Sequence, residues 1–187
     1  MDTPTKMAST PNRVAIIGAG SVGSDIAFAL ILRRLAAEIV LVDVDTVRCH
    51  AQVQDLSDGA FLSSTRVYEG SFKEASQCDI IVITAGAKQR PGESRTDLLG
   101  RNMGILKAVL DGMKPLRPDA ILLIVANPVD ILTFFAQQMS GLPRGQVIGT
   151  GTFLDTARLR IFLAEETQAS QHPAAVVHTA SDLLHSK

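Results

Sequence analysis

Three glycines between two contrasting segments constrain this chain most. The apolar run "RVAIIG" (Arg13–Gly18) is typical of a buried strand, and "SVGSDIAFALILRR" (Ser21–Arg34) carries its apolar residues at helical spacing. Across their junction runs "GAGSVG", in which Gly18, Gly20 and Gly23 form a complete GxGxxG pattern. The pattern predicts a tight turn at Gly18, close approach of backbone to a pyrophosphate at Gly20, and close helix-to-strand packing at Gly23.

A second element of the pattern lies at the end of the next apolar run, "EIVLVD" (Glu38–Asp43). Asp43 stands twenty residues beyond Gly23. A carboxylate there can accept hydrogen bonds from an adenosine ribose and would repel a 2′-phosphate, which favours NAD over NADP. The alternative, glycines that serve only a tight turn beside a loop-capping Asp43, stays open. The neighbouring Asp45 is expected to cap a helix.

Short apolar strands alternate with longer helical stretches along the rest of the chain. This alternation predicts an α/β protein with a doubly wound, Rossmann-type parallel sheet. Residues 1–12 are expected to be a flexible polar arm, 13–150 the nucleotide-binding domain, and 151–187 the start of a second, substrate domain with an atypical or truncated tail. The expected strands are Thr65–Gly70, Asp79–Gly86, Ala120–Asn127 and Gln146–Gly151, and the expected helices are Thr46 to about Gly59, Asp97–Met113, Val129–Ser140 and Phe153 to about Glu166.

Composition excludes several classes of function. Hydrophobic residues make up 46 % of the chain and the net charge is −1, which indicates a soluble globular protein and no nucleic-acid partner. Cys49 and Cys78 form no CxxC pair and no metal site, as expected of reduced cytoplasmic thiols. No apolar run approaches the ~18 residues of a membrane helix, and the N-terminus lacks the apolar core of a signal peptide.

Polar residues gather where the predicted strands end, which is where ligands bind in such sheets. They are Thr84–Gly86, the loop Lys88–Arg95, and Asn127 before a proline. The alternatives are a solvated loop and, for Asn127, an ordinary turn residue. Asp155 and Arg158 lie on one helix face at i, i+3 spacing, so they are either a surface ion pair or part of the site.

Five segments, "GAGSVG", "LVDVD", "TAGAKQRPGESR", "VANPVDILT" and "GTGTFLDTARLR", resemble the lactate/malate (2-hydroxy-acid) dehydrogenases in order and spacing. The likeness covers about residues 13–166 and is stronger to the L-lactate branch than to the malate branch. It implies hydride transfer between lactate or pyruvate and NAD, and dimers or tetramers that pair through the helix with "AQVQDLSDGAFL". The cofactor-binding residues it implies are Gly18, Gly20, Ser21, Val22, Gly23, Asp43, Thr84, Ala85, Gly86, Asn102, Val125 and Asn127.

The resemblance also implies a mobile lid at residues 87–96. Arg95 within it would stabilise charge on the substrate keto oxygen. Gln89 stands where malate dehydrogenases carry an arginine, and its neutral side chain favours pyruvate or lactate over a dicarboxylate. Arg90, next in the chain, leaves the malate alternative open, because a one-residue shift of the alignment would reverse the inference.

The other implied substrate residues lie further along the chain. Asn127 would bond near the reacting carbonyl, and its bond to Pro128 would be cis. Arg158 would hold the substrate carboxylate with two hydrogen bonds. Asp155 would orient a catalytic histidine and stabilise its charged form.

The chain departs from the family at that histidine. The family's Gly-Glu-His-Gly-Asp motif is absent, and counting forward from Arg158 reaches the neighbourhood of Asp182. His178 and His185 are the nearest imidazoles, and neither is expected to be the general acid/base. The chain by itself is therefore expected to be incomplete and weakly active or inactive, and a non-catalytic NAD-binding or subunit-interaction isoform is the alternative.

Overall fold

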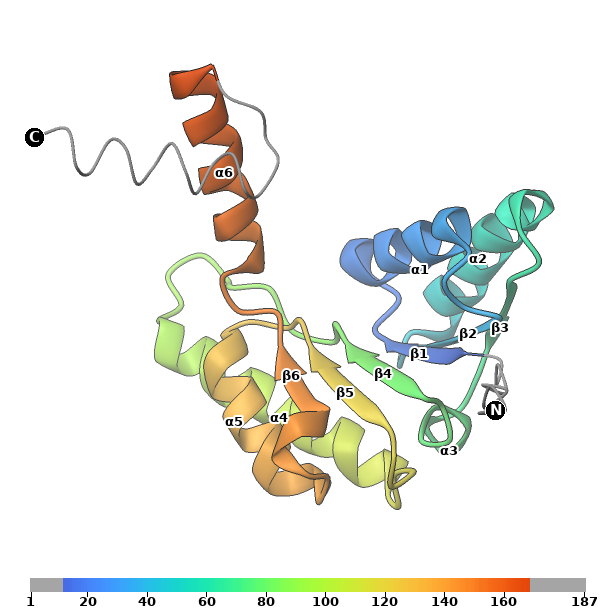
Figure 1. Ribbon diagram of the computed structural model, residues 1–187. Coiled ribbons are helices and arrows are strands. Elements are labelled where there is room, and N and C mark those ends of the chain that lie inside the picture. The colour runs from blue at the N-terminus through green and yellow to red at the C-terminus, as the bar shows by residue number, and fades with distance from the viewer. Residues whose placement is uncertain (1–11, 169–187) are drawn as a thin grey trace, which may run out of the picture. The chain divides into compact units, whose positions relative to one another are not determined.

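The computed structural model describes residues 12–168, which form two compact units divided between Gly149 and Thr150. The first unit is one six-stranded parallel sheet of order β3-β2-β1-β4-β5-β6 with helices on both faces (Figure 1). The predicted Rossmann-type, doubly wound sheet is confirmed. Its strands are β1 (Arg13–Ile17), β2 (Glu38–Val42), β3 (Arg66–Glu69), β4 (Ile80–Ile83), β5 (Ile121–Ile124) and β6 (Val147–Gly149), and its helices are α1 (Ser21–Arg33), α2 (Thr46–Asp58), α3 (Phe72–Ala75), α4 (Arg95–Met113) and α5 (Val129–Ser140), with 3-10 turns at Gly59–Leu62 and Arg144–Gln146.

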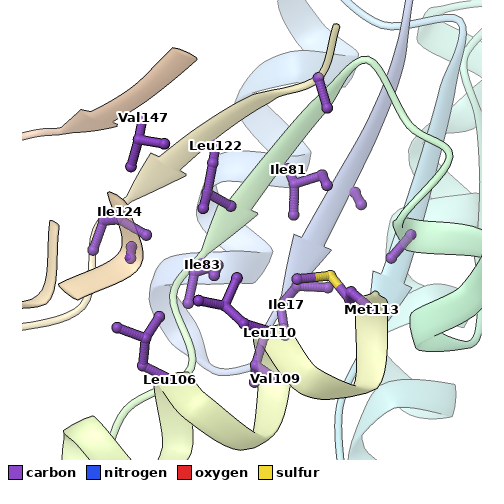
Figure 2. Close-up of a cluster of buried hydrophobic side chains, with 14 of the residues drawn as sticks. Ile17, Ile81, Ile83, Leu106, Val109, Leu110, Met113, Leu122, Ile124 and Val147 are labelled. Carbon is purple, nitrogen blue, oxygen red and sulfur yellow. The ribbon is translucent and has the colours of Figure 1, made fainter. Parts of the chain in front are cut away.

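Strand side chains alternate between two apolar layers. In β1, Val14 and Ile16 pack with α1 and α2, whereas Ala15 and Ile17 pack with α3, α4 and α5. Burial on both faces explains why the strands are nearly continuous apolar runs. Figure 2 shows the second layer, where α4 places its apolar face against β1, β4 and β5 through Leu106, Val109, Leu110 and Met113.

Helix α4 begins two residues earlier than the apolar pattern predicts. Ser94 Oγ accepts the Asp97 N–H at 3.1 Å, and the Asp97 carboxylate accepts the Ser94 N–H at 3.3 Å. This reciprocal capping satisfies two N–H groups at the start of the helix. Arg95 is therefore the first residue of α4 and lies outside the loop to which the lid prediction assigned it.

The central strands end earlier than predicted. The N–H groups of Thr84 and Ala85 both bond to the carbonyl of Ile17, and those of Val125 and Ala126 both bond to the carbonyl of Ile83. Two donors on one acceptor end the regular parallel ladder, so residues 84–86 and 125–127 become loops at the edge of the sheet. The short helix α3, which begins with its own Ser71–Glu74 capping box, was not predicted.

The second unit contains α6 (Phe153–Thr167), close to the bounds expected from the sequence. Of its side chains only Ala164 is buried, and Phe153 and Phe162 are 75 % and 58 % exposed. Within residues 12–168, no helix has the length and apolarity that crossing a membrane requires, and no three His, Cys, Asp or Glu side chains gather as metal ligands would.

Candidate functional site

A cavity of about 380 Å³ opens at the carboxyl ends of the strands, beside the switch point between β1 and β4. Its walls come from the ends of β1, β2 and β4, from Phe72 of α3, and from one side of α4. The chain leaves β1 and β4 in opposite directions there, which opens a crevice above the sheet edge. The size is that of a small-molecule site.

The three glycines of "GAGSVG" play different steric roles around this cavity. Gly18 has φ +111°, and a Cβ there would lie 2.7 Å from the amide nitrogen of Ala85. A Cβ on Gly23 would lie 1.9 Å from the carbonyl oxygen of Gly18, which is the close packing that the spacing predicts. Gly20 lines the cavity, and a Cβ on it would meet nothing within 4 Å. The backbone of Gly20 is thus open to a ligand.

Helix α1 begins at this same point with Gly20 as its N-cap. No side chain of the described part of the chain caps it, and its first turn carries no acidic residue. The N–H groups of its first turn and its positive dipole end suit an anionic group such as a phosphate.

Asp43 is held against the glycine turn. Its Oδ2 accepts the N–H of Ala19 at 2.7 Å, and its Oδ1 accepts the N–H of Asp45 at 2.9 Å. These two hydrogen bonds fix the orientation of the half-buried carboxylate, which lines the cavity. Its oxygens keep further lone pairs that can accept hydrogen bonds from a ligand.

Asp45 caps α2, as predicted, by accepting the N–H of Arg48 at 3.0 Å. This bond, with the ion pair between the two side chains, holds the pKa of Asp45 below its ordinary value. Arg48 also lines the cavity, which therefore presents an acid and a guanidinium at the end of β2. The sequence reasoning did not select Arg48.

A second cavity, of about 270 Å³, brings together residues from three segments of the chain. Gln89, Arg95 and Asn127 line it with Leu98 and Pro128. The bond between Asn127 and Pro128 is cis, as the resemblance implied. Three of the four predicted substrate-binding residues thus share one concave site.

The loop that carries Gln89 is tied to α4 in this structure. The Glu93 carboxylate accepts the N–H of Arg90 at 2.8 Å and the guanidinium of Arg101 at 2.7 Å, and Arg101 also donates to the carbonyl of Lys88. The bond from the Arg90 backbone, followed by the contact with Arg101, holds the pKa of Glu93 below its ordinary value. The Gln89 amide donates to the Glu93 carbonyl at 2.8 Å.

Comparison with known proteins agrees with this geometry. A family model described as the NAD-binding domain of lactate/malate dehydrogenase matches residues 12–149. The chain belongs to the lactate/malate dehydrogenase family. The L-lactate dehydrogenase A of Rhizopus oryzae is 54 % identical over 154 residues, which are 82 % of this chain and 48 % of that protein.

Two solved structures extend the relationship to the fold. The minor L-lactate dehydrogenase of Enterococcus mundtii, in its ligands-bound form, has a TM-score of 0.81 at 35 % identity and covers 86 % of this chain and 52 % of that one. A malate dehydrogenase from Salinibacter ruber has a TM-score of 0.76 at 33 % identity and covers 85 % of this chain and 51 % of that one. The chain spans about half the length of the relatives it matches, and enzymes of this family are NAD-dependent oxidoreductases.

Several of the family-implied cofactor residues line neither cavity. Ser21, Val22 and Gly23 form the first turn of α1. Val125 follows β5 and packs with the α1–α2 layer of the core. Asn102 is buried in α4, and both ends of its amide are bonded to backbone.

Thr84, Ala85 and Gly86 do line the larger cavity. The Thr84 hydroxyl lies 2.9 Å from the carbonyl oxygen of Gly18 and turns toward the end of β1.

The opening turns of α6 carry Asp155 and Arg158, the two residues of the second unit to which the family resemblance assigned roles. Arg158 Nη1 lies 3.3 Å from Asp155 Oδ1, and the side chains are 72 % and 71 % exposed, respectively. An isolated ion pair at that exposure contributes little to stability. Their catalytic and substrate-binding roles remain proposals.

His50 is the one imidazole among the described residues. It lies on α2, contacts Glu69, and lines neither cavity. His172, His178, His185 and Asp182 lie outside the described part of the chain.

Sequence reasoning missed the apolar wall of the larger cavity. Ile105 and Val109 sit at i, i+4 spacing on α4, so the helical period carries a usable signal for them. The sequence gives no comparable signal for Phe72, because this residue belongs to α3, which was not predicted.

Proposed function

We propose that this chain carries the nucleotide-binding half of an NAD-dependent L-lactate dehydrogenase. The observation that carries the proposal is the cavity in which the open backbone of Gly20, the start of α1 and the fixed carboxylate of Asp43 meet. These groups suit the diphosphate and the ribose of an adenosine diphosphate, because the helix start attracts phosphate and the acid can accept a hydrogen bond from a ribose hydroxyl.

The smaller cavity is the proposed place of the substrate. The Arg95 guanidinium would stabilise negative charge on the keto oxygen of pyruvate, and the Asn127 amide would donate a hydrogen bond beside it. Reduction of pyruvate to lactate adds a hydride to the carbonyl carbon and a proton to its oxygen. NAD, when bound in its reduced form, supplies the hydride.

Two further roles belong to the second unit. Arg158 would pair with the substrate carboxylate, and Asp155 would orient the histidine that donates the proton. Gln89 offers no charge to a second carboxylate, which supports a monocarboxylate substrate over malate or oxaloacetate.

The nucleotide part of the proposal is tested by titrating the purified 187-residue chain with NADH and NADPH. NADH should bind at least about tenfold more tightly than NADPH, and Asp43→Ala should weaken NADH binding. Asp58→Ala, which removes an exposed acid at the end of α2, should bind NADH as the wild type does. A folded wild-type chain that does not bind NADH would overturn the proposal.

The substrate part needs an imidazole that the described residues do not place in either cavity. We expect the chain alone to oxidise little or no NADH with pyruvate. A chimera of residues 1–166 with the remaining half of the Rhizopus oryzae enzyme should reduce pyruvate in preference to oxaloacetate. Preference for oxaloacetate would favour a malate enzyme, and an NADH-binding chimera without either activity would favour the non-catalytic isoform.

A further inference from the structure

The buried amide of Asn102 joins the two segments that form the candidate cavities. Its Oδ1 accepts the N–H of Ala87 at 2.7 Å, and its Nδ2 donates to the carbonyl of Asn127 at 2.7 Å. The side chain is 3 % exposed. The amide oxygen and the amide nitrogen therefore each bond to a backbone group, in two segments that follow different strands.

The two bonded segments belong to different cavities. Ala87 lines the larger one and begins the loop that carries Gln89, whereas Asn127 lines the smaller one. Asn102 itself lines neither. Any effect of Asn102 on ligands must pass through the backbone that it holds.

The support for this amide is rigid. Leu106, one turn further along α4, is 2 % exposed and packs in the second apolar layer, with Val109 and Leu110 beyond it (Figure 2). Buried, close-packed side chains keep α4 in one position relative to the sheet. The amide can therefore hold both loops to the core.

We propose that Asn102 is a positioning residue, which sets the distance between the nucleotide-binding and substrate-binding backbone segments before any ligand arrives. The proposal rests on the proposed function for the identity of those ligands. The structural part of the proposal concerns the ligand-free chain. The proposal gives Asn102 a positioning role in place of the direct cofactor contact that the family resemblance implied.

The chemistry of the site restricts what can replace the amide. Aspartate keeps an acceptor for the Ala87 N–H but at neutral pH has no donor for the Asn127 carbonyl. Leucine has similar size and neither group. The two variants separate the two bonds, and Ser140→Ala, which removes a buried hydroxyl that accepts the N–H of Leu142, is the matched control.

The test is hydrogen exchange at the Ala87 amide in the ligand-free 187-residue chain. Exchange should be at least about tenfold faster in Asn102→Leu, because a buried donor loses its partner, and within about twofold of wild type in Asn102→Asp and Ser140→Ala. The 13C shift of the Asn127 carbonyl should move in both Asn102 variants. NADH should bind at least about tenfold more weakly to Asn102→Leu than to Ser140→Ala.

Unchanged Ala87 exchange in a folded Asn102→Leu chain would overturn the proposal. Should that variant fail to fold, Asn102→Asp tests the proposal instead. The proposal is overturned if the Ala87 amide of Asn102→Asp exchanges as fast as in an unfolded chain, or if the 13C shift of its Asn127 carbonyl does not move. Failure of the wild-type chain to bind NADH would overturn the proposed function alone, because the exchange measurements need no ligand.

Discussion

At the scale of single residues, the glycine turn separates folding from binding. Gly23 has no room for a side chain, because a Cβ there would overlap the carbonyl of Gly18. Gly20 has room in the ligand-free chain and faces the candidate pyrophosphate position. The same residue type is therefore needed for packing at one position and for ligand approach at the other.

Alanine substitution should distinguish these two roles. Gly23→Ala should lower the free energy of unfolding by about 2–4 kcal/mol, since the contact is with backbone that cannot move freely. Gly20→Ala should cost about 1 kcal/mol or less, as expected for an N-cap glycine, yet weaken NADH binding at least about tenfold. Urea unfolding and NADH titration measure the two effects, and equal losses of stability in both variants would contradict the assignment.

The reactivity of the two thiols also depends on their immediate surroundings. Cys49 and Cys78 are buried and form no disulfide, and burial raises the pKa of both thiols, that of Cys78 to about 11. A thiolate is the reactive form, so a raised pKa suppresses reaction at neutral pH. The expectation of two reduced thiols agrees with the structure.

Thiol titration tests this directly. At pH 8 the folded chain should react with a disulfide reagent at least about 100-fold more slowly than the unfolded chain, which should release two equivalents. The reaction should accelerate only as the pH rises toward the raised pKa values, because the folded state disfavours the thiolate below them. Rapid reaction of the folded chain at pH 8 would show that one thiol is accessible.

At the scale of elements, α4 connects the core to the candidate site. Its capping box places Arg95 at its start, Arg101 reaches the loop in its second turn, and its later turns fill the apolar layer (Figure 2). The loop is held through Glu93, whose pKa is lowered by the Arg90 backbone N–H and by Arg101. The charged form of Glu93 therefore supports the tether at neutral pH, and the support is lost only as acid protonates it.

Breaking this tether should expose the loop to protease. Glu93→Gln should speed tryptic cleavage after Lys88 several-fold at neutral pH, because the contact with Arg101 loses its charge. Asp111→Asn, which removes a carboxylate bonded to Lys107 and Lys114 at the far end of the same helix, is the control and should cleave as the wild type does. Equal cleavage rates for wild type and Glu93→Gln would show that the ion pair does not restrain the loop.

At the scale of the whole molecule, the two units differ in how they bury apolar surface. The first unit covers both faces of its sheet, whereas α6 of the second leaves most of its large apolar side chains exposed. Exposed apolar groups that gather on one element favour association, whereas single ones are common on protein surfaces.

The purified chain should therefore bind a hydrophobic dye through α6. Replacing Phe153 and Phe162 by serine should lower the dye fluorescence at least about twofold, with little effect on the thermal midpoint of the sheet unit. Val47→Ser, at an 80 % exposed position on α2, is the control and should leave the fluorescence nearly unchanged. An equal decrease in the control would show that the dye does not report on α6.

Much of the fold was predictable because its signals are local. Apolar runs of four to five residues mark β1, β2, β4 and β5, and the GxGxxG spacing correctly predicted which glycines are sterically required. Errors concentrate at element ends. Helix α3, the early start of α4 and the short ends of β4 and β5 depend on capping bonds and on backbone acceptors in neighbouring strands.

The sequence by itself determined the doubly wound sheet, the glycine turn beside Asp43 and the family, since these follow from period, spacing and motif order. Only the tertiary structure decided that Gln89, Arg95 and Asn127 share a cavity, that Arg48 and Phe72 line the larger cavity, and that Asn102 bonds to the backbone of two segments that follow different strands. The physical reason is distance along the chain. Ala87, Asn102 and Asn127 are brought together by parallel strand order and by the packing of α4, and no local pattern encodes that contact.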